Sequence, residues 1–360
     1  MLKTWLKLFF RNSKKNWLNT TINISGLTLG LVGLIIVLLY YNDEKSYDQW
    51  NTQKDIVYKV SHKWGDGQVY DGATDPEGKT VKEVVPEVTD YCLLHSGYNS
   101  QILRYKDQSV YETKIGRANA NFFEFFPHTI VKGDPKEILA TKTSIAISTD
   151  LEKQLFGEKE SIGKIIKYGK KECIITGVYE LKKPSVYLPN AIMHELEKKS
   201  DNWGGYGVYT FYKIPVGTDI ASVEKKIFDI YVDKYYKKEA DKQGITVDEY
   251  VSMQGSYPIL EKLADLRLHG KGDEGMLEGK GNYSLLIIML SLSILIIIIS
   301  SINFINLSIA SASQRAKEVG VKKTLGVSKM GLQLQFILEI VIQGIIAVFL
   351  ALIIVELLLP

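Results

Sequence analysis

The chain contains few of the residues that usually carry catalytic or metal-binding chemistry. Its 360 residues include two cysteines and five histidines, which limits the sites that thiolate or imidazole ligands could build. Cys92 and Cys173 could form one disulfide in an oxidising compartment, or they could be two buried free thiols, and the sequence leaves both possibilities open. The histidines are scattered without the spacing of metal ligands: His62, His95, His128, His194 and His269.

The sequence also lacks complete motifs for nucleotide binding or hydrolysis. In the glycine-rich stretch at 269–284, Gly281 follows Lys280 where a phosphate-binding loop needs serine or threonine, and no strand pattern precedes it. "HELEK", at 194–198, begins like a zinc-protease motif, but Lys198 replaces the second histidine. No G-x-S-x-G elbow occurs. We therefore expect a chain that is not an enzyme, binds no cofactor and receives the energy for any work from a partner.

Acidic residues are missing from positions 1–19, which carry five basic side chains. Residues 313–330 are basic as well, with five lysines or arginines against one glutamate, whereas the middle of the chain is mildly acidic. Basic residues stay on the cytoplasmic side of a membrane, so this asymmetry indicates membrane topology and does not favour nucleic-acid binding. It predicts a cytoplasmic N-terminus, an extracytoplasmic middle and a cytoplasmic loop at 313–330.

Three apolar runs, at 22–41, 285–309 and 332–359, reach the length of about 20 residues that spans a bilayer. The first follows a basic start, as in a signal peptide. It is too long and lacks a small-residue cleavage site, so we interpret it as an uncleaved anchor. The fold class is therefore an integral membrane protein with α-helical transmembrane segments. Strand-like alternation and amphipathic helices predict an α+β extracytoplasmic domain inserted between helices one and two.

The predicted segments are a cytoplasmic or interfacial amphipathic helix (1–19), a first transmembrane helix with a stalk (20–50), the extracytoplasmic domain (51–268), a glycine-rich flexible linker (269–283), a second transmembrane helix (284–312), a cytoplasmic loop (313–330) and a third transmembrane helix (331–359). The first segment could instead be an extension of the first transmembrane helix. Within the domain we expect hairpins at 100–119 and 163–180, a strand at 185–188 and a long helix at 219–242. We also expect a helix at 149–157, capped by Thr149 and Glu152.

Small and polar residues recur inside the apolar runs. Gly26, Gly30 and Gly33 would let another helix approach closely. Polar side chains are costly in a bilayer and usually face other helices. In the second and third runs they include Asn303, Gln335, Glu339 and Gln343. We interpret both groups as helix-packing residues, and a transport pathway is the alternative that the pattern leaves open.

The loop between the second and third runs carries an ordered pattern that topology alone does not explain. Residues 306–341 read "NLSIASASQRAKEVGVKKTLGVSKMGLQLQFILEIV". This string closely resembles the cytoplasmic loop of MacB/FtsX-type ABC transporter permeases. "SIAISTDLEKQLFGEKESIGKIIKYG", at 144–169, resembles the MacB-like periplasmic core domain of the same family, and "LADLRLHG", at 263–270, resembles the segment that leads to its second helix.

The resemblance implies that the loop is a coupling helix seated in a groove of a cognate ABC ATPase, which would hold ATP and Mg²⁺. Basic side chains would contact an acidic groove while aliphatic side chains anchor the helix. The matching positions are Arg315, Lys317, Glu318, Val319, Gly320, Val321, Lys322, Lys323, Leu325 and Gly326. The resemblance also implies a bacterial inner-membrane location and a homo- or heterodimeric permease. A periplasmic adaptor or outer-membrane channel would be a further partner. This chain would be the N-terminal part of a permease with four or eight transmembrane helices.

The implied function is mechanotransmission, in which ATP hydrolysis by the partner moves the membrane helices and, through them, the external domain. Such movement would export or extract envelope substrates such as peptides, drugs or lipoproteins. An alternative within the family is an FtsX-like regulatory scaffold that activates a cell-wall hydrolase, and the sequence does not separate the two. A membrane receptor fits least well, because the sequence shows no cytoplasmic signalling domain.

Overall fold

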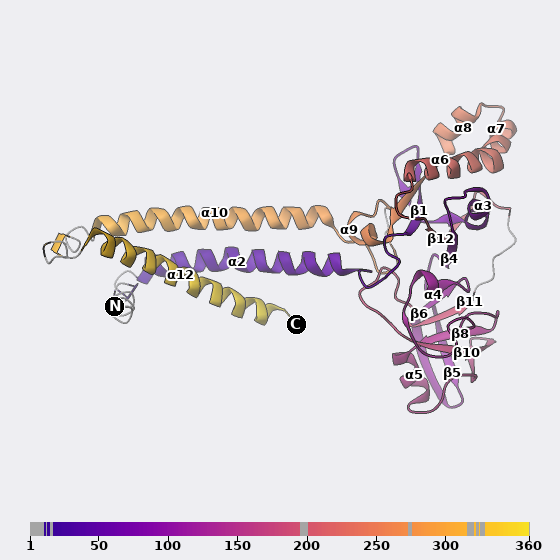
Figure 1. Cartoon of the computed structure of the whole chain (residues 1–360), viewed down its shortest axis with the longest axis horizontal. Coiled ribbons are helices and arrows are strands. Elements are labelled where there is room, and N and C mark those ends of the chain that lie inside the picture. The colour runs from indigo at the N-terminus through magenta and orange to yellow at the C-terminus, as the bar shows by residue number, and fades with distance from the viewer. Residues whose placement is uncertain are drawn as a thin grey trace. The chain divides into compact units, whose positions relative to one another are not determined.

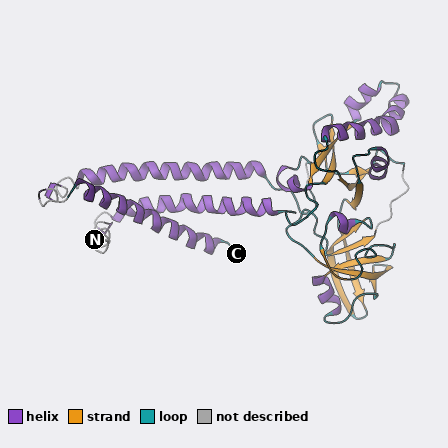
Figure 2. Ribbon diagram, in the orientation of Figure 1, coloured by secondary structure: helices purple, strands orange, loops and turns teal. Residues whose placement is uncertain are grey.

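The computed structural model describes residues 11, 13–14, 17–194, 201–272, 276–314, 320–321, 324 and 328–359 (Figure 1). The chain forms two compact units. Unit 1 consists of Met1–Asp43 and Asn282–Pro360, and unit 2 consists of Glu44–Gly281. In the sequence, unit 2 is therefore inserted between the two parts of unit 1. The described strands all belong to unit 2, as the orange arrows in Figure 2 show.

Unit 1 contains α10 (Tyr283–Gln314), α12 (Lys329–Leu358) and most of α2 (Trp17–Ser46), whose residues from Glu44 on belong to unit 2. Each is long and apolar enough to cross a membrane, as the sequence predicted. At about 1.5 Å per residue these helices are about 45 Å long, which exceeds the ~30 Å hydrocarbon core of a bilayer. Helix α12 starts where the hydroxyl of Ser328 accepts a hydrogen bond from the Gly331 amide at 3.2 Å.

Helix α2 ends at Ser46 and not at residue 50, where the sequence analysis placed the end of the stalk. Residues 47–50 form a turn. Asp48 has a φ of +55°, a left-handed conformation that a right-handed helix cannot contain. The predicted stalk is therefore shorter than expected, and the chain enters unit 2 through a tight turn.

One lobe of unit 2 is a closed ring of strands, called the barrel below. Its strands are β5 (Asn99–Tyr105), β6 (Gln108–Ala118), β8 (Ser144–Ser148), β9 (Ile165–Tyr168), β10 (Lys171–Glu180) and β11 (Ala191–His194). The pairing order is β11–β8–β10–β9–β5–β6, and β6 returns to β11 in parallel, with Ile115 opposite Ala191. β7 (Thr129–Lys132) pairs with β10, and α5 (Thr149–Phe156) contributes Leu151 and Leu155 to the interior. Every strand of the ring adds a buried apolar side chain, so the barrel is a packed core and not a channel.

The other lobe, called the sheet lobe, is an antiparallel sheet in the order β4 (Asp90–His95), β12 (Tyr206–Lys213), β1 (Val57–Trp64) and β13 (Ser256–Lys262). Short strands β2 (Val69–Tyr70) and β3 (Ala73–Thr74) pair with β1 and β12. Its helices are α3 (Glu77–Val84), α6 (Ile220–Tyr231), α7 (Lys237–Gln243) and α8 (Val247–Gln254). A π-helical segment (Val232–Tyr236) separates α6 from α7, so the long helix predicted at 219–242 contains a bulge.

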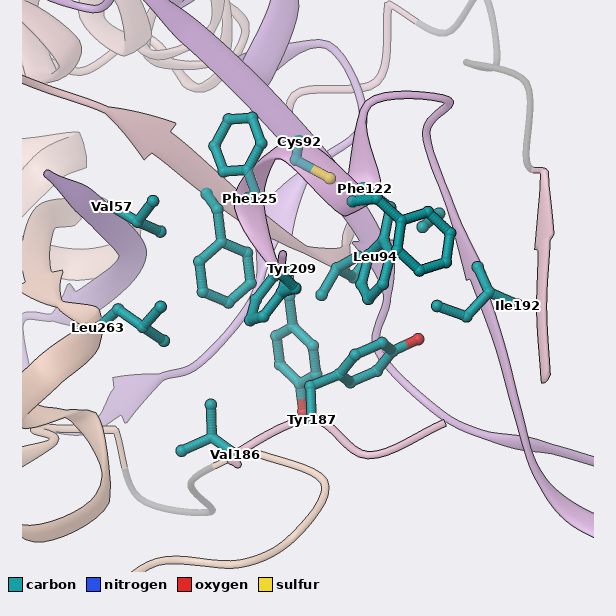
Figure 3. Packing of buried hydrophobic residues seen from close by; sticks show 14 of the residues in the cluster. Val57, Cys92, Leu94, Phe122, Phe125, Val186, Tyr187, Ile192, Tyr209 and Leu263 are labelled. Atoms are coloured by element: carbon teal, nitrogen blue, oxygen red, sulfur yellow. The ribbon is translucent and has the colours of Figure 1, made fainter. Parts of the chain in front are cut away.

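A shared aromatic core joins the two lobes (Figure 3). Its centre is α4 (Phe122–Phe125), and residues of the sheet lobe such as Cys92 and Tyr209 pack with Tyr187 and with Ile192 of β11. A 3₁₀ turn (Leu263–Asp265) and α9 (Leu266–His269) lie at the edge of this core. Cys92 belongs to the shared core and Cys173 to the barrel interior. Both are buried free thiols, which decides between the two possibilities that the sequence left open.

The local sequence predictions were right for the two hairpins and wrong at two other points. The pairs β5–β6 and β9–β10 match the expected hairpins. The cap of α5 is Ser148, whose hydroxyl accepts from the Leu151 amide at 3.2 Å, and Thr149 is the first helical residue. Glu152 does not complete a capping box, because its carboxylate accepts hydrogen bonds from Lys132 and Ser161. Residues 185–188 are a loop and not a strand.

Candidate functional site

The point where the chain enters and leaves unit 2 is held by an ion pair between Glu44 and Arg267. Glu44 lies in the last turn of α2, and Arg267 lies on α9. The guanidinium binds the carboxylate through two nitrogens, with Nη2 2.9 Å from Oε1 and Nε bonded to Oε2. The side chain of Glu44 is 3% exposed and that of Arg267 is 14% exposed. A two-pronged, nearly dry arginine–carboxylate pair is among the stronger polar contacts in proteins.

Arg267 also organises the chain that leads out of unit 2. Its Nη1 donates to the carbonyls of Glu278 and Gly279, at 2.8 and 3.0 Å, and the guanidinium lies 4.1 Å from the ring centroid of Tyr47. The Gly281 amide donates to the Arg267 carbonyl at 2.7 Å. One side chain therefore bonds the end of α2, the following turn and the segment that leads to α10.

Gly281 fits this arrangement because it has no side chain. A Cβ at this position would lie 2.5 Å from the Glu44 carboxylate and 2.9 Å from the Arg267 carbonyl oxygen. Such contacts are too short for any other residue. The entry residue Glu44 and the exit residue Gly281 therefore lie side by side. We call Glu44, Tyr47, Arg267 and Gly281 the junction.

Asp48 fastens the turn after α2 to the loop at 184–188. Its carboxylate accepts hydrogen bonds from the Val186 amide at 2.9 Å and from the Ser185 hydroxyl. Its own amide donates to the Pro184 carbonyl at 3.1 Å, and the Trp50 indole donates to the same carbonyl at 2.9 Å. Burial raises the pKa of Asp48 to about 6, and the two hydrogen bonds to its carboxylate oppose part of that rise.

His128 packs against Trp50, with the ring centroids 4.8 Å apart. Its Nδ1 accepts a hydrogen bond from the Lys182 amide at 3.2 Å, which requires a neutral ring with an unprotonated Nδ1. Burial, together with the nearby Lys182 ammonium, lowers the pKa of His128 to about 3. The packing around the turn thus contains a neutral histidine at physiological pH.

The sheet lobe contains a glutamate–histidine–serine array that resembles a catalytic triad. His62 Nε2 lies 3.0 Å from the Glu77 carboxylate, and its Nδ1 lies 3.2 Å from the Ser256 hydroxyl. All three side chains are completely buried, and Tyr231 also donates to Glu77 at 2.7 Å. A nucleophile without access to solvent cannot meet a substrate. The array is therefore a satisfied polar network in the core.

In unit 1, the three predicted glycines of α2 face α10. A Cβ at Gly26 or Gly33 would lie 3.0 Å from the hydroxyl of Ser300 or Ser293, respectively, and a Cβ at Gly30 would lie 2.7 Å from a side-chain carbon of Ile297. The two helices therefore approach at backbone distance along this glycine face, as small residues allow.

Helix α2 also contacts α12. The hydroxyl of Thr28 donates to the Ala347 carbonyl at 3.4 Å, and Val32 packs against Ala351 and Val355. The unit 1 helices are thus joined through α2, which touches α10 with its glycines and α12 with small and branched residues.

The other predicted residues of unit 1 are less completely placed. Asn303 and Glu339 are half-buried, and Oε1 of Gln343 is buried with no hydrogen-bond partner among the described residues. The side chain of Gln335 lies outside the described part. In the predicted coupling loop, Gly320 and Val321 are helical and exposed. The remaining loop positions lie outside the described residues: Arg315, Lys317, Glu318, Val319, Lys322, Lys323, Leu325 and Gly326.

No pattern in the sequence singles out the junction. Glu44 and Arg267 are 223 positions apart, and neither belongs to a motif that indicates pairing. The segment at 269–283 was predicted as a flexible linker. Its described residues are instead held by Arg267, and residues 276 and 279 form a β-bridge.

Two family models match the chain. The model of the MacB-like periplasmic core domain matches residues 20–230, and the model of the FtsX-like permease C-terminal region matches residues 290–360. The chain belongs to the MacB/FtsX-type permeases. Glu44 and Tyr47 of the junction lie within the region that matches the MacB-like model, and Arg267 and Gly281 lie between the two matched regions.

The similar curated proteins are macrolide export ATP-binding/permease proteins named MacB. The one from Hahella chejuensis is 22% identical over 364 residues, covering 94% of this chain and 50% of that protein. The one from Bdellovibrio bacteriovorus is 21% identical over 201 residues, covering 55% and 28%. This permease chain therefore spans half or less of the length of these relatives.

Similar solved structures include the periplasmic region of MacB from Actinobacillus actinomycetemcomitans. It has 12% identity and a TM-score of 0.38, and the match covers 60% of this chain and 94% of that one. The extracellular domain of the ABC-type transporter YknZ from Gram-positive bacteria has 15% identity and a TM-score of 0.37, with 56% and 99% covered.

Proposed function

We propose that this chain is a permease subunit that couples ATP hydrolysis by a partner ATPase to movement of unit 2. The observation that carries the proposal is the junction, where one arginine cross-links the chain that enters unit 2 to the chain that leaves it. Movement of the end of α2 would act on the segment that leads out of unit 2, and the reverse, through the short and nearly buried hydrogen bonds of Arg267. Strong bonds of this kind favour joint movement of the two segments over independent local movement of either one.

The glycine face supports the same proposal from within the membrane helices. Because α2 and α10 approach at backbone distance, they would move together when one of them is pushed. Helix α2 continues without a break from Trp17 to Ser46, so a push at its start would reach Glu44 at the junction. ATP and Mg²⁺ belong to the partner in this proposal, which the loop at 313–330 would contact through its basic and aliphatic residues.

For topology, we propose an inner-membrane protein with a cytoplasmic N-terminus, a cytoplasmic loop at 313–330 and unit 2 outside the cytoplasm. The charge asymmetry of the sequence supports this orientation. An engineered cysteine at Ser313 should resist a membrane-impermeant maleimide added to intact cells, whereas a cysteine at exposed Tyr111 of unit 2 should react. The reverse pattern of labelling would overturn the orientation.

The proposed activity is export or extraction of envelope substrates such as peptides, drugs or lipoproteins. The relatives named for macrolide export support this class, and a dimeric permease with a periplasmic adaptor or outer-membrane channel would complete the pathway. The comparisons do not favour the alternative of a scaffold for a cell-wall hydrolase.

Co-purification of the cognate ATPase with variants of the loop at 313–330 tests the proposal. Replacement of Glu318 by Lys together with Leu325 by Asp should abolish co-purification of the cognate ATPase from detergent extracts, while the variant still inserts into membranes. Lys171→Ala, a single change on the exposed surface of unit 2, is the control and should leave co-purification intact. Co-purification of the ATPase with the double variant at the wild-type level would remove the coupling role of the loop.

A further inference from the structure

The segment that leads out of unit 2, residues 270–281 in its described parts, touches both lobes. We call it the return segment. On the sheet-lobe side, the Lys271 amide donates to the Glu261 carboxylate of β13, and Gly272 lies so close to Asp71 that a Cβ would overlap its carboxylate. The Lys280 ammonium bonds back to the Gly272 carbonyl at 2.9 Å. This end of the return segment is therefore tied to the sheet lobe.

On the barrel side, the contact is made by the side chain of Glu278. Its carboxylate accepts two bonds from the Lys114 ammonium of β6, at 2.8 and 2.7 Å, and one from the Tyr98 hydroxyl at 3.0 Å. Tyr98 in turn accepts a hydrogen bond from the Leu188 amide at 2.6 Å and stacks on Tyr187 of the shared core at 5.3 Å. One carboxylate thus bonds a barrel strand and, through a tyrosine, the loop that precedes β11.

The protonation states suit these bonds. Burial raises the pKa of Tyr98, and the neighbouring Tyr187 and Glu278 raise it further, so the hydroxyl keeps its proton and can donate to the carboxylate. Glu278 is 15% exposed and Lys114 39% exposed, so solvent screens this pair more than the pair of Glu44 and Arg267. The attachment of Glu278 to Lys114 is therefore weaker than the pair of Glu44 and Arg267.

The backbone of Glu278 connects this attachment to the junction. The same residue whose side chain binds the barrel offers its carbonyl to Arg267 at 2.8 Å. Met276, two positions earlier, is buried in the shared core, and its carbonyl accepts from the Gly279 amide at 2.7 Å, which closes a tight turn around Glu278. The side chain and the carbonyl of Glu278 are thus held by the barrel and by the junction.

We infer that Glu278 fastens the return segment to the barrel and passes movement at the junction to it. The inference deepens the proposed function and rests on it, since it names the route by which movement would reach one lobe. Glu278 acts in this scheme as a positioning residue, because it touches no substrate. Loss of its charge should free the barrel from the junction while the Glu44–Arg267 pair stays intact.

The test is hydrogen–deuterium exchange on the full chain in lipid nanodiscs with its cognate ATPase. Without nucleotide, Glu278→Gln should speed exchange of the Leu188 amide about tenfold, which corresponds to about 1.4 kcal/mol. Lys114→Met should do the same by a second route. Glu87→Gln is the control, because it removes a similar half-exposed pair with Lys226 elsewhere in unit 2. Unchanged exchange at Leu188 in both test variants would overturn the inference.

A non-hydrolysable ATP analogue then separates this inference from the proposed function. In the wild type, the analogue should change exchange of the Gly281 amide at the junction and of the barrel amides. In Glu278→Gln, the change at Gly281 should persist and the change in the barrel should disappear. If the barrel change survives in Glu278→Gln, the inference fails while the proposed function stands. If the wild type shows no change at Gly281, the proposed function fails, and the arm without nucleotide still decides the attachment.

Discussion

The coupling free energy between Glu44 and Arg267 in the junction can be measured with a double-mutant cycle. Removing one partner of a buried ion pair leaves the other charge unpaired, which typically costs about 3–5 kcal/mol. The carboxylate of Glu44 is 3% exposed, so Glu44→Gln and Arg267→Met should each lower the free energy of unfolding by about this amount. These losses include the penalty for the stranded charge.

The double variant should cost much less than the sum of the single variants. It leaves no stranded charge, and replacing a buried ion pair as a whole is often about neutral. The remaining losses are the bonds of Arg267 to two carbonyls, about 1 kcal/mol each, and its contact with the ring of Tyr47, also about 1 kcal/mol. We therefore expect a loss of about 3 kcal/mol for the double variant, where additivity would give about 6–10 kcal/mol. The coupling energy between the two positions should accordingly be several kcal/mol.

The assay is urea denaturation of the full chain in nanodiscs, with tryptophan fluorescence as the signal that reports unfolding. The matched control is the exposed pair of Lys225 and Asp229 on α6, with side chains 79% and 60% exposed, whose coupling should be at most about 0.5 kcal/mol. Additive losses at the junction, or a loss below about 1 kcal/mol for Glu44→Gln, would refute the view that this pair is a stiff connection.

Further predictions concern acid response, helix packing and thiol chemistry. The raised pKa of Asp48 adds about 3 kcal/mol of stability below pH 4, and this contribution is lost as pH rises through about 6. Asp48→Asn should therefore flatten the dependence of the melting temperature on pH between about 4 and 6. An unaltered slope in that range would contradict the raised pKa of Asp48. The lowered pKa of His128 acts in the opposite sense: its contribution is present above pH 6.5 and is lost as pH falls towards 3, so His128→Phe should melt with less acid sensitivity than the wild type. Gly30→Leu should push α2 away from α10, because a Cβ at position 30 would lie 2.7 Å from a side-chain carbon of Ile297. Cysteine cross-linking between the two helices should therefore fall, and an unchanged yield would argue against close packing. Cys92 and Cys173 should react with maleimide only after denaturation, and the mobility of the denatured chain in electrophoresis should not depend on reductant; a reductant-dependent shift would reveal a disulfide.

The sequence predicted those features that depend on neighbouring residues. Apolar runs of sufficient length identified the three long helices, and alternation with a turn identified the β5–β6 hairpin. The helix cap was displaced by one residue, because Ser148 and Thr149 are both good caps and only the extended backbone of Ser148 decides between them. The identity of the family followed from an ordered string and not from any single residue.

The features that escaped prediction depend on contacts between distant positions. Closure of the barrel needs β11 beside β6, and the junction needs Glu44 beside Arg267, pairs that no periodicity encodes. The turn at Asp48 could not be predicted for a similar reason, because its left-handed backbone is stabilised by partners at 184–186, far along the chain. Residues 185–188 looked like a strand by composition, but their amides bind side chains such as Asp48 and Tyr98 in place of a neighbouring strand.

The parallel pairing of β6 with β11 has a consequence for association with other chains. Each of the six strands in the ring pairs with a ring strand on both sides, so the ring has no edge strand, and β7 pairs with β10 outside it. The closed ring therefore offers no edge strand to which the sheet of another protein could add.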